Sequence, residues 1–420
     1  MDSLSPSIVY YGNRYRERKH YWYGTQRSAT PKETYDTIKP YFKEVGLTRL
    51  ANITGLDRIG IHTVLAIRPN SYYLSVDAGK GFTLEAAEVS AAMECIERYV
   101  GEHATIEEIN LSYKDIGSLY GLIPIENLPF INKLMFSENR ADRWAIGYDI
   151  INKQEVAVPY VTVSMRGPHD RKDELYTFMF GSNGLASGNT FLEAVYMGLL
   201  ETIERDAITS HSVARTYINY NPPRVDTKTI RFPLVLDLIK RIKEAQVHVV
   251  IYDCTVDTAI PVYLAYIYDH NRNIGIYKGY GAHLDPEIAL IRAITEAVQG
   301  RLIYISGSRD DFFRNNLISL KLSDNQRQIE RLEAIAPTID ISGLKSDSTD
   351  TFEEDILICL DRLKRAGLNQ AVVFDLTPKG YKVNIVRVVV PGLEGYAYKY
   401  YSPGTRALSF AQSRSVAHKY

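Results

Sequence analysis

Three segments of the chain place carboxylates at helical spacing inside otherwise apolar sequence. In the first, Ser90, Glu94 and Glu97 are spaced i, i+4 and i+7, so they share one face of a helix expected from about 84 to 101. The neighbouring positions carry Ala, Met, Cys, Val and Ile. Because a helix that is apolar nearly all round is normally buried, we expect these glutamates to lie inside the protein.

The second segment carries Glu193, Glu201 and Glu204 on a helix expected from about 190 to 210. At about 100° per residue these three side chains fall within roughly 80° of one another, and no other charge occurs between the first two. Thr190 precedes Glu193 by three positions, so this glutamate alone also fits the carboxyl end of a capping box.

A third helix, expected over about 286–305, spaces Arg292, Glu296 and Gln299 as the first helix spaces its polar residues. An ionised carboxylate buried without a partner is costly or is forced to protonate, so three such helices together need cations. Oxygen ligands suit Mg²⁺, and a phosphate-bearing ligand would complete the shell of two or more ions.

Ordinary ion pairing is the alternative explanation for these carboxylates. The arginines available to neutralise them are Arg98, Arg205, Arg292 and Arg301. Glu97 with Arg98, and Glu204 with Arg205, would then form pairs at the edge of the core. This alternative explains any single glutamate well but three stripes together poorly.

Glycine-rich segments precede the first two helices. Gly79-Lys80-Gly81 is expected between a strand and a helix, where backbone N–H groups and a lysine can meet a phosphate, although the P-loop pattern is absent. Ser182-Asn183-Gly184 and Gly188-Asn189 suit either the same role or a turn with an asparagine cap. Asp285-Pro286 is explained as an N-cap and first helical residue, without chemistry.

Strands and helices mix without strict alternation, which predicts an α+β fold. We expect one catalytic domain over 46–400, an N-terminal segment of 1–45 and a mildly basic tail of 401–420 that is a disordered terminus or, alternatively, a peptide-binding element. Further helices are expected over 31–45 and 352–366, and a polar surface excursion containing one helix over 306–352. Strands are expected over 61–67, 72–76, 155–164, 274–279, 371–377 and 382–390, with a hairpin from 247–255 and 261–269.

Composition argues against several other classes of protein. The net charge of −1 provides no global attraction for nucleic acid or an anionic membrane, so neither partner is expected. No window has the apolar length of a membrane span, and residues 1–20 carry charges where a signal peptide needs an apolar run. Cys95, Cys254 and Cys359 lack zinc-ligand spacing, so we expect buried, inert thiols in a cytoplasmic protein.

These residues resemble the three signature motifs of the YcaO family, in order and with suitable separations. The motifs read Ser90-x-x-x-Glu94-x-x-Glu97-Arg98, then Asn189-x-x-x-Glu193 with Glu201-x-x-Glu204-Arg205, then Glu296-x-x-Gln299-x-Arg301. The resemblance covers roughly 45–400. It implies mixed β-sheets flanked by long helices and an unusual ATP-binding site in which glutamates hold Mg²⁺ around the triphosphate.

The resemblance also implies roles for individual residues. The expected Mg²⁺ ligands are Glu94, Glu97, Glu193, Glu201, Glu204 and Glu296. The expected nucleotide contacts are Lys80, Ser90, Glu97, Arg98, Asn189, Glu193, Arg292, Gln299 and Arg301. The residues expected to act in catalysis are Glu94, Glu201, Glu204 and Arg205. Asp375-Leu376-Thr377 and Arg387 with 391–394 also look like family segments, or alternatively like a strand end and a turn.

By this resemblance, a nucleophile adds to a peptide amide carbonyl, the oxygen is phosphorylated and phosphate is expelled. A Cys, Ser or Thr side chain gives an azoline, sulfide gives a thioamide and an amine gives an amidine. The segment 48–81 resembles members that install thioamides with a TfuA-type partner, and residues 415–420 lack the Pro-x-Pro-x-Pro ending of many azoline-forming members. We therefore expect an ATP-dependent thioamide synthetase.

Two alternatives stay open: an azoline-forming cyclodehydratase with the same site, and a nucleotide-binding subunit without turnover. The intact glutamate stripes argue against the second, since a degenerate subunit has no need for a costly carboxylate cluster. The expected partners are a peptide or protein substrate, a TfuA-like protein or another sulfur-delivery partner, and a second copy of the chain in the homodimer that the resemblance implies.

Overall fold

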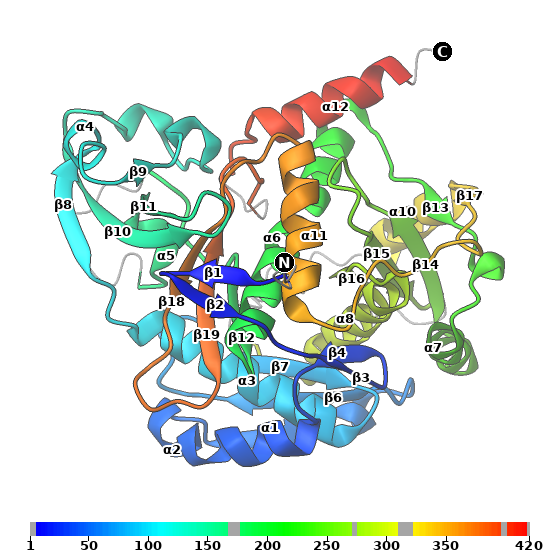
Figure 1. Ribbon diagram of the computed structural model, residues 1–420. Helices are drawn as coiled ribbons and strands as arrows, with labels where there is room; N and C mark the ends of the chain where they lie inside the picture. Colours follow the sequence, from blue (N-terminus) through cyan, green and yellow to red (C-terminus); the bar gives the residue numbers. More distant parts are fainter. Residues whose placement is uncertain (1–5, 167–176, 271–274, 310–321, 396–400, 418–420) are drawn as a thin grey trace, which may run out of the picture.

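The computed structural model describes residues 6–166, 177–270, 275–309, 322–395 and 401–417. Within them the protein has the expected α+β architecture (Figure 1). Sheets of seven, five and three strands are accompanied by two short hairpins. Three long helices, α3 (Leu84–His103), α6 (Phe191–Ile218) and α8 (Pro286–Ser306), pack against these sheets. No helix in the described ranges is long and apolar enough to cross a membrane.

Each long helix follows a strand after a short turn. The strand–helix pairs are β7 (Val76–Gly81) with α3, β12 (Leu185–Gly188) with α6, and β16 (Ile276–Ala282) with α8. The side chains of Thr83, Thr190 and Asp285 cap the three helices by accepting a backbone N–H from the first turn. The N-caps at Thr190 and Asp285 agree with the sequence. The asparagine cap considered for Asn189 is wrong, because Thr190 is the N-cap and the amide of Asn189 donates to Glu193 instead.

Glycines in the strands allow two of these helices to lie directly on their sheets. A Cβ added at Gly79 of β7 would lie 2.1 Å from the backbone nitrogen of Ala91 in α3. A Cβ at Gly279 of β16 would lie 2.2 Å from the backbone nitrogen of Ala297 in α8. Since no side chain fits at either position, glycine sets how closely each helix approaches its strand.

Two of the sheets carry α3 and α8. The three-stranded sheet is antiparallel, in the order β5 (Arg49–Asn52), β6 (His62–Ile67) and β7. The five-stranded sheet has the order β16, β15 (Val262–Tyr268), β14 (His248–Asp253), β13 (Arg224–Val225) and β17 (Pro337–Ile339). The predicted hairpin is the antiparallel pair β14–β15, while β17 pairs with β13 in parallel.

The largest sheet carries α6 at one edge. Its order is β12, β19 (Asn384–Val389), β18 (Val372–Asp375), β10 (Ala141–Asp149), β11 (Gln154–Pro159) and β9 (Gly121–Leu122), with β8 (Glu108–Ser112) also paired to β10. Leu185 of β12 lies opposite Arg387 of β19. This register brings a residue from near the C-terminus beside the strand that leads into α6.

The apolar interior forms one cluster around each long helix. The cluster around α6 includes residues of α11 (Phe352–Arg365), and the cluster around α8 includes residues of α7 (Pro233–Glu244). The cluster around α3 includes residues of β10, β11, β18 and β19. The three carboxylate-bearing helices are therefore central to the packing, as their apolar composition indicates.

The N-terminal segment wraps over this framework as small elements. It contains the hairpins β1 (Ile8–Tyr10) with β2 (Asn13–Tyr15) and β3 (His20–Trp22) with β4 (Thr25–Arg27). The helix expected over 31–45 is present as α1 (Pro31–Ile38) and α2 (Phe42–Val45), joined by a 3₁₀ turn at 39–41. Among the described residues, the remaining α-helices are α4 (Tyr113–Ile116), α5 (Tyr160–Val163), α10 (Leu322–Ala334) and α12 (Thr405–Ala417).

Several sequence-based expectations are wrong in detail. The strand expected over 72–76 begins only at Val76 and continues through Gly81, so the Gly-Lys-Gly segment belongs to β7 rather than to a loop. The strand expected over 155–164 ends at Pro159, where α5 begins. Residues 310–321 of the expected excursion and 418–420 of the tail lie outside the described residues.

The expectation of a disordered C-terminus is also wrong, because residues 405–417 form α12. Arg406 of this helix pairs with the buried Asp206 of α6 at 2.9 Å. The N–H of Ala407 donates to Glu394 at 2.8 Å. These contacts tie α12 to the body of the protein.

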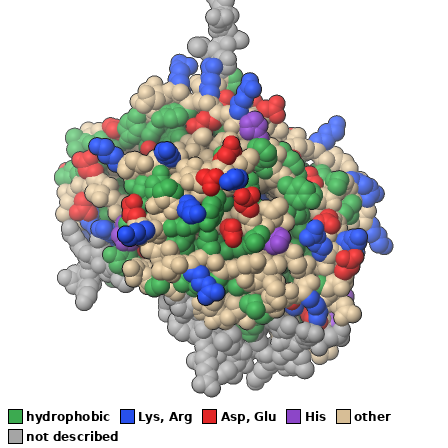
Figure 2. Space-filling view, turned by 90° about the horizontal axis from the view of Figure 1, so that it is seen from below, with side chains coloured by type: hydrophobic (Ala, Val, Ile, Leu, Met, Phe, Trp, Pro, Cys, Tyr) green, Lys and Arg blue, Asp and Glu red, His purple; other side chains and the backbone are tan. Residues whose placement is uncertain are grey.

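Charges of both signs are interspersed on the face of the molecule shown in Figure 2. Several aspartate and glutamate side chains gather near the middle of this face around basic ones, while other lysines and arginines lie toward its edges, with hydrophobic side chains between them. This mixed surface agrees with the near-zero net charge of the chain.

Candidate functional site

The carboxylates of α3 and α6 are brought together by the fold. Burial, followed by the charges of Glu201 and Glu94, raises the pKa of Glu97 well above its ordinary value. The hydroxyl of Ser187, in β12, donates a hydrogen bond to Glu97 at 2.9 Å. The first two predicted stripes therefore share one site.

Glu201 and Glu204 extend this site toward α8. Burial raises the pKa of Glu201 to about 7, with Arg205 opposing the shift and Glu204 adding to it. Burial also raises the pKa of Glu204, with Arg205 opposing the shift and Glu296 of α8 adding to it. The N–H of Ala282, at the end of β16, donates to Glu204 at 3.1 Å. All three stripes thus converge.

Lys80 connects β7 with α8. Its Nζ donates to Oε1 of Gln299 at 3.1 Å and lies 3.7 Å from Oε2 of Glu296. Its charge also favours the ionised form of Glu204. The lysine therefore reaches glutamates of two helices, from a strand rather than from the loop that the sequence suggested.

Asp77 is a site carboxylate that the sequence reasoning missed. It is buried near the start of β7, with Oδ1 2.7 Å from Nε of Arg98. The same arginine donates to Glu94 at 3.2 Å. Burial, followed by the charge of Glu94, raises the pKa of Asp77 to about 7, while Arg98 opposes the shift. A lone acid at a strand position was a readable signal, because it needs a partner when the strand is buried.

Glu193, at the start of α6, is held by its own set of donors. Ser28 donates its N–H at 3.0 Å and its hydroxyl at 2.6 Å to Oε2, and Nδ2 of Asn189 lies 3.2 Å from both carboxylate oxygens. Arg27 lies 3.7 Å away. Thr190 accepts the N–H of Glu193, so half of the capping box is present, but the carboxylate serves Ser28 and Asn189.

Three arginines around the carboxylates have buried N–H groups without an acceptor among the described residues. These groups are Nη1 of Arg27, Nε of Arg292 and Nη1 of Arg387. The charge of Arg292 favours the ionised forms of Glu201 and Glu204 and opposes that of Arg27. Arg292 therefore lies between Glu201 and Glu204 on one side and Arg27, next to Glu193, on the other.

Arg387 supports the cluster from the interior. Its Nε and Nη2 donate to the carbonyl of Thr162 at 3.1 and 2.7 Å. Burial lowers the pKa of Arg387 to about 10, and the charges of Glu201 and Glu97 oppose that shift. The side chain therefore stays protonated at neutral pH and compensates part of the carboxylate charge.

This arrangement fits Mg²⁺ together with a polyphosphate. Buried glutamates whose ionisation is suppressed need cations, and carboxylate oxygens are ligands that Mg²⁺ prefers. Buried arginine N–H groups without acceptors need an anion with several oxygens. A metal-bound triphosphate meets both needs at once, which neither ion pairing nor an apolar ligand does.

Not every predicted site residue lies in the cluster. Arg301 is buried and donates to Asp57 at 2.7 and 3.2 Å. It is five positions after Glu296, or about 140° around the helix, so it faces a different neighbour. Ser90 is half-buried on α3, one turn before Glu94.

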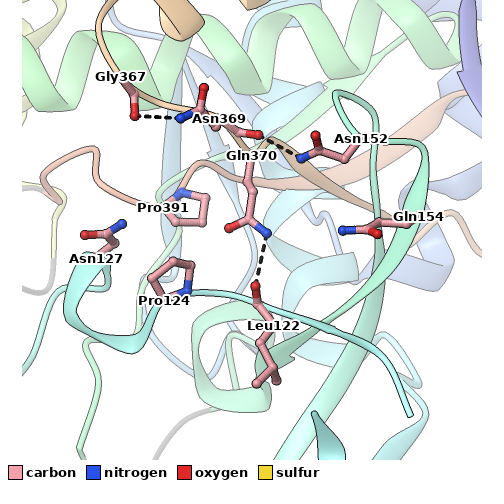
Figure 3. Close-up of a pocket in the computed structure, with 9 residues that line it drawn as sticks. All are labelled: Leu122, Pro124, Asn127, Asn152, Gln154, Gly367, Asn369, Gln370 and Pro391. Carbon is pink, nitrogen blue, oxygen red and sulfur yellow. Dashed lines mark hydrogen bonds between the residues drawn. The ribbon is translucent and has the colours of Figure 1, made fainter. Parts of the chain in front are cut away.

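The cysteines and an amide-lined cavity lie outside this cluster. Cys95, Cys254 and Cys359 are buried and free, and burial raises the pKa of each thiol, as expected for inert cysteines. A cavity of about 440 Å³ opens between β9, β11 and the segment before β18 (Figure 3). Its lining is rich in amide side chains and includes Asn127, Asn152, Gln154, Asn369 and Gln370.

A family model described as YcaO cyclodehydratase, ATP- and Mg²⁺-binding, matches residues 78–394. The chain belongs to the YcaO family. The match includes all three carboxylate helices, so the family resemblance carried by their motifs is confirmed. ATP and Mg²⁺, which the charge arrangement fits, are the ligands of this family.

Two relatives are similar to the chain over most of its length. A protein of Rhizobium leguminosarum bv. trifolii, described by its place in the tfuA 3′ region, is 33% identical over 392 residues, or 91% of this chain and 92% of its own. A protein of Methanothermobacter thermautotrophicus is 33% identical over 379 residues, or 88% of this chain and 96% of its own.

Solved YcaO structures have the same fold. YcaO from Methanopyrus kandleri, bound with AMPPCP and Mg²⁺, matches with a TM-score of 0.70 at 26% identity, covering 89% of this chain and 94% of that one. A heterocyclase in complex with substrate and cofactor matches with a TM-score of 0.75 at 23% identity. This match covers 90% of the present chain but only 54% of the heterocyclase, and it shows the fold alone.

Proposed function

We propose that this YcaO protein is an ATP- and Mg²⁺-dependent enzyme that activates a backbone amide of a peptide or protein, and that its product is a thioamide. The observation that carries the metal–nucleotide site is the convergence of carboxylates from three helices beside arginines whose buried N–H groups lack acceptors among the described residues. Amide activation is proposed because the chain belongs to the YcaO family. The relative in the tfuA 3′ region supports the thioamide and a TfuA-like partner for sulfur delivery, because it is similar over nearly the whole of both chains.

In this proposal some carboxylates bind Mg²⁺ and others position neighbouring side chains. The Mg²⁺ ligands are drawn from Glu94, Glu97, Glu193, Glu201, Glu204 and Glu296. Asp77 acts indirectly, by holding Arg98 beside Glu94. Arg387 compensates the charges of Glu201 and Glu97 from the protein interior.

The basic residues bind and orient phosphate oxygens. Arg27 and Arg292 offer buried N–H groups that have no acceptor among the described residues, and Lys80 adds a charge between α6 and α8. When bound, ATP supplies the phosphoryl group that converts an amide oxygen into a leaving group. The protein orients that phosphoryl group and excludes water from it, in a low-dielectric setting where fixed charges act strongly.

Calorimetry with ATP and Mg²⁺ tests the site directly. Wild-type protein is compared with the Glu201→Gln and Glu94→Gln variants, and with Glu107→Gln as a matched control on an exposed glutamate. We expect the first two variants to lose about tenfold or more in affinity, as metal-site ligands do, and the control to bind normally. Wild-type binding that is absent, or indifferent to both substitutions, would return the glutamates to structural ion pairing.

Product analysis separates the proposed reaction from its alternatives. A peptide substrate is incubated with ATP, sulfide and the TfuA-like partner, and its mass is measured. The mass should change by the difference between one sulfur atom and one oxygen atom. An azoline-forming enzyme would instead remove one water from a peptide containing Cys, Ser or Thr, without added sulfide. A nucleotide-binding subunit would show no rise in ADP release when peptide is added. We also propose a homodimer, which light scattering after size-exclusion chromatography checks.

A further inference from the structure

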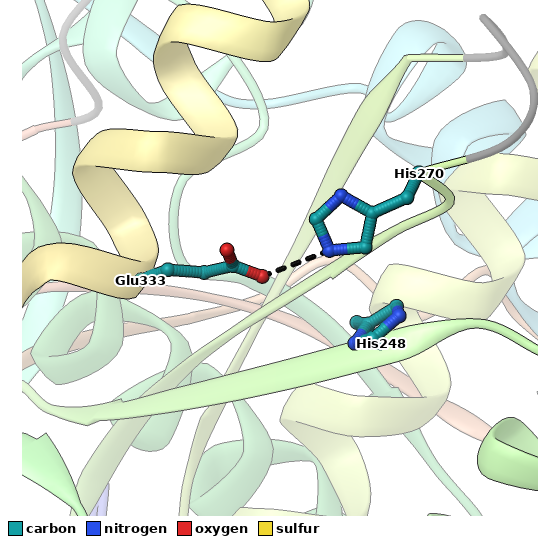
Figure 4. Close-up of side chains that lie close together, drawn as sticks. All are labelled: His248, His270 and Glu333. Carbon is teal, nitrogen blue, oxygen red and sulfur yellow. Dashed lines mark hydrogen bonds and ion pairs between the residues drawn. The ribbon is translucent and has the colours of Figure 1, made fainter.

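A second group of metal-binding side chains lies at the other end of the five-stranded sheet from Ala282. His248 is the first residue of β14, and it pairs with Tyr268, the last residue of β15. His270 follows two positions later, and Glu333 projects from α10 (Figure 4). Their potential ligand atoms all lie within 4.8 Å of one another.

The three side chains already point toward one another. Nε2 of His270 lies 2.9 Å from Oε1 of Glu333. The imidazole rings of His248 and His270 are 4.4 Å apart between centroids, at an interplanar angle of 82°. A hydrogen bond between His270 and Glu333 accounts for that pair alone. It does not account for the second imidazole, whose ring lies edge-to-face against that of His270.

Buried residues hold this group in place. Tyr268 is 1% exposed, its hydroxyl donates to Glu333 at 2.9 Å, and its ring stacks on His248 at an interplanar angle of 8°. Asp269, next to His270, is buried and accepts a hydrogen bond from Arg58 at 2.6 Å. Tyr268 thus orients two of the three side chains, as outer residues do in metal sites, while the Asp269–Arg58 contact fixes the backbone next to His270.

We propose that His248, His270 and Glu333 bind a divalent transition-metal ion, with Zn²⁺ as the natural occupant. Two imidazoles and one carboxylate form a ligand set that suits Zn²⁺ and disfavours Mg²⁺. Zinc bonds of about 2.0–2.2 Å bring tetrahedral ligand atoms to roughly 3.3 Å from one another, which small side-chain rotations reach here. Because all three residues are exposed, the fourth position is open to water.

Such an ion would fasten α10 to the sheet. Glu333 belongs to α10, whereas both histidines belong to the β14–β15 hairpin or its end. The site shares no residue with the carboxylate cluster and does not depend on the proposed amide activation. Its contribution would be to the stability of this part of the domain, through the binding free energy of the ion.

Titration of the full-length chain with Zn²⁺, in excess Mg²⁺ and without nucleotide, tests the site. We expect a single Zn²⁺ per chain, with an affinity reduced by about 10- to 100-fold or more in His248→Ala and His270→Ala. Glu333→Gln should weaken binding as well. His20→Ala, at an exposed histidine elsewhere, and Glu201→Gln, in the carboxylate cluster, should leave it unchanged.

Co²⁺ supplies a second readout, since four-coordinate Co²⁺ absorbs visible light strongly enough to report its geometry. The thermal shift caused by Zn²⁺ should disappear in the two histidine variants, while circular dichroism shows that they remain folded. The proposal is overturned if no ion binds, if both histidine variants bind as the wild type does, or if binding is lost only in Glu201→Gln.

Discussion

Replacing Glu201 with glutamine should stabilise the ligand-free protein while weakening its affinity for Mg²⁺ and ATP. Burial raises the pKa of this glutamate from 4.5 to about 7. The folded protein therefore retains a proton on Glu201 between these values, and stability is lost as the pH rises from 4.5 through about 7. Glutamine has nearly the same shape and carries no charge, so the variant avoids this loss.

The expected size follows from the pKa. Each pKa unit corresponds to about 1.4 kcal/mol, so the displacement amounts to at most about 3 kcal/mol at pH 8. This displacement already includes the opposing attraction of Arg205. Because the Glu201 side chain is only half-buried and partly screened by solvent, we expect a net stabilisation of about 1–3 kcal/mol. For a chain of this length that raises Tm by about 1 to 3 °C.

Thermal unfolding at pH 8 and pH 5, with Glu107→Gln as control, measures the effect. The gain in Tm should be present at pH 8 and fall away at pH 5, where the wild-type glutamate is already protonated. If Glu201 served only as the ion-pair partner of Arg205, the substitution would lower Tm instead of raising it. Removing one partner of a buried pair costs about 3–5 kcal/mol of stability. A lower Tm at pH 8, or unchanged nucleotide affinity, would refute the metal-site reasoning.

Three further outcomes follow from the structure. Binding of Mg²⁺ and ATP at pH 7 should release protons, because the metal favours ionised Glu201; calorimetric heats would then vary with the ionisation enthalpy of the buffer, and invariant heats would contradict this. Gly79→Ala should cost more than about 3 kcal/mol, since its Cβ meets helix backbone at 2.1 Å, whereas Gly343→Ala, in open space, should be nearly neutral in denaturant unfolding. Arg406→Ala removes a cation from a buried carboxylate and should cost about 3 kcal/mol and expose α12 to proteolysis. Arg365→Ala breaks only an exposed pair, so a cost above about 1 kcal/mol there would undermine the comparison.

The long helices were predictable because their signal is local. Apolar stripes with period 3.6 identify α3, α6 and α8, and the side chains of Thr190 and Asp285 mark two of their starts. Gly79 was misassigned to a loop because glycine usually marks turns. Here it lies in a strand since α3 packs directly on it, and that requirement is visible only in three dimensions.

The part of the site that was predictable lies on the three stripes and in the segments just before two of the helices, which contain Lys80 and Asn189. The remaining contacts come from distant parts of the sequence. Ser28 contacts Glu193 across 165 positions of sequence, and Arg406 reaches Asp206 across 200. No local pattern predicts such contacts. The direction of Arg301, in contrast, was readable, because five positions turn a helical side chain well away from Glu296. The prediction for Arg301 followed the spacing of the family motif, although helical geometry places this side chain on a different face of α8 from Glu296.

The order of assembly follows from the pairing of β12 with β19. Leu185 of β12 lies beside Arg387 of β19. The ribosome makes these two strands far apart in time, and they must pair before the charge of Arg387 can compensate the glutamates of the site. Contacts of such high sequence separation close late, at a large entropic cost. A nascent chain that ends before β19 therefore carries Glu97 and Glu201 without their interior cation. Nucleotide binding should consequently mark completed synthesis, and truncated fragments should form neither the site nor a stable core.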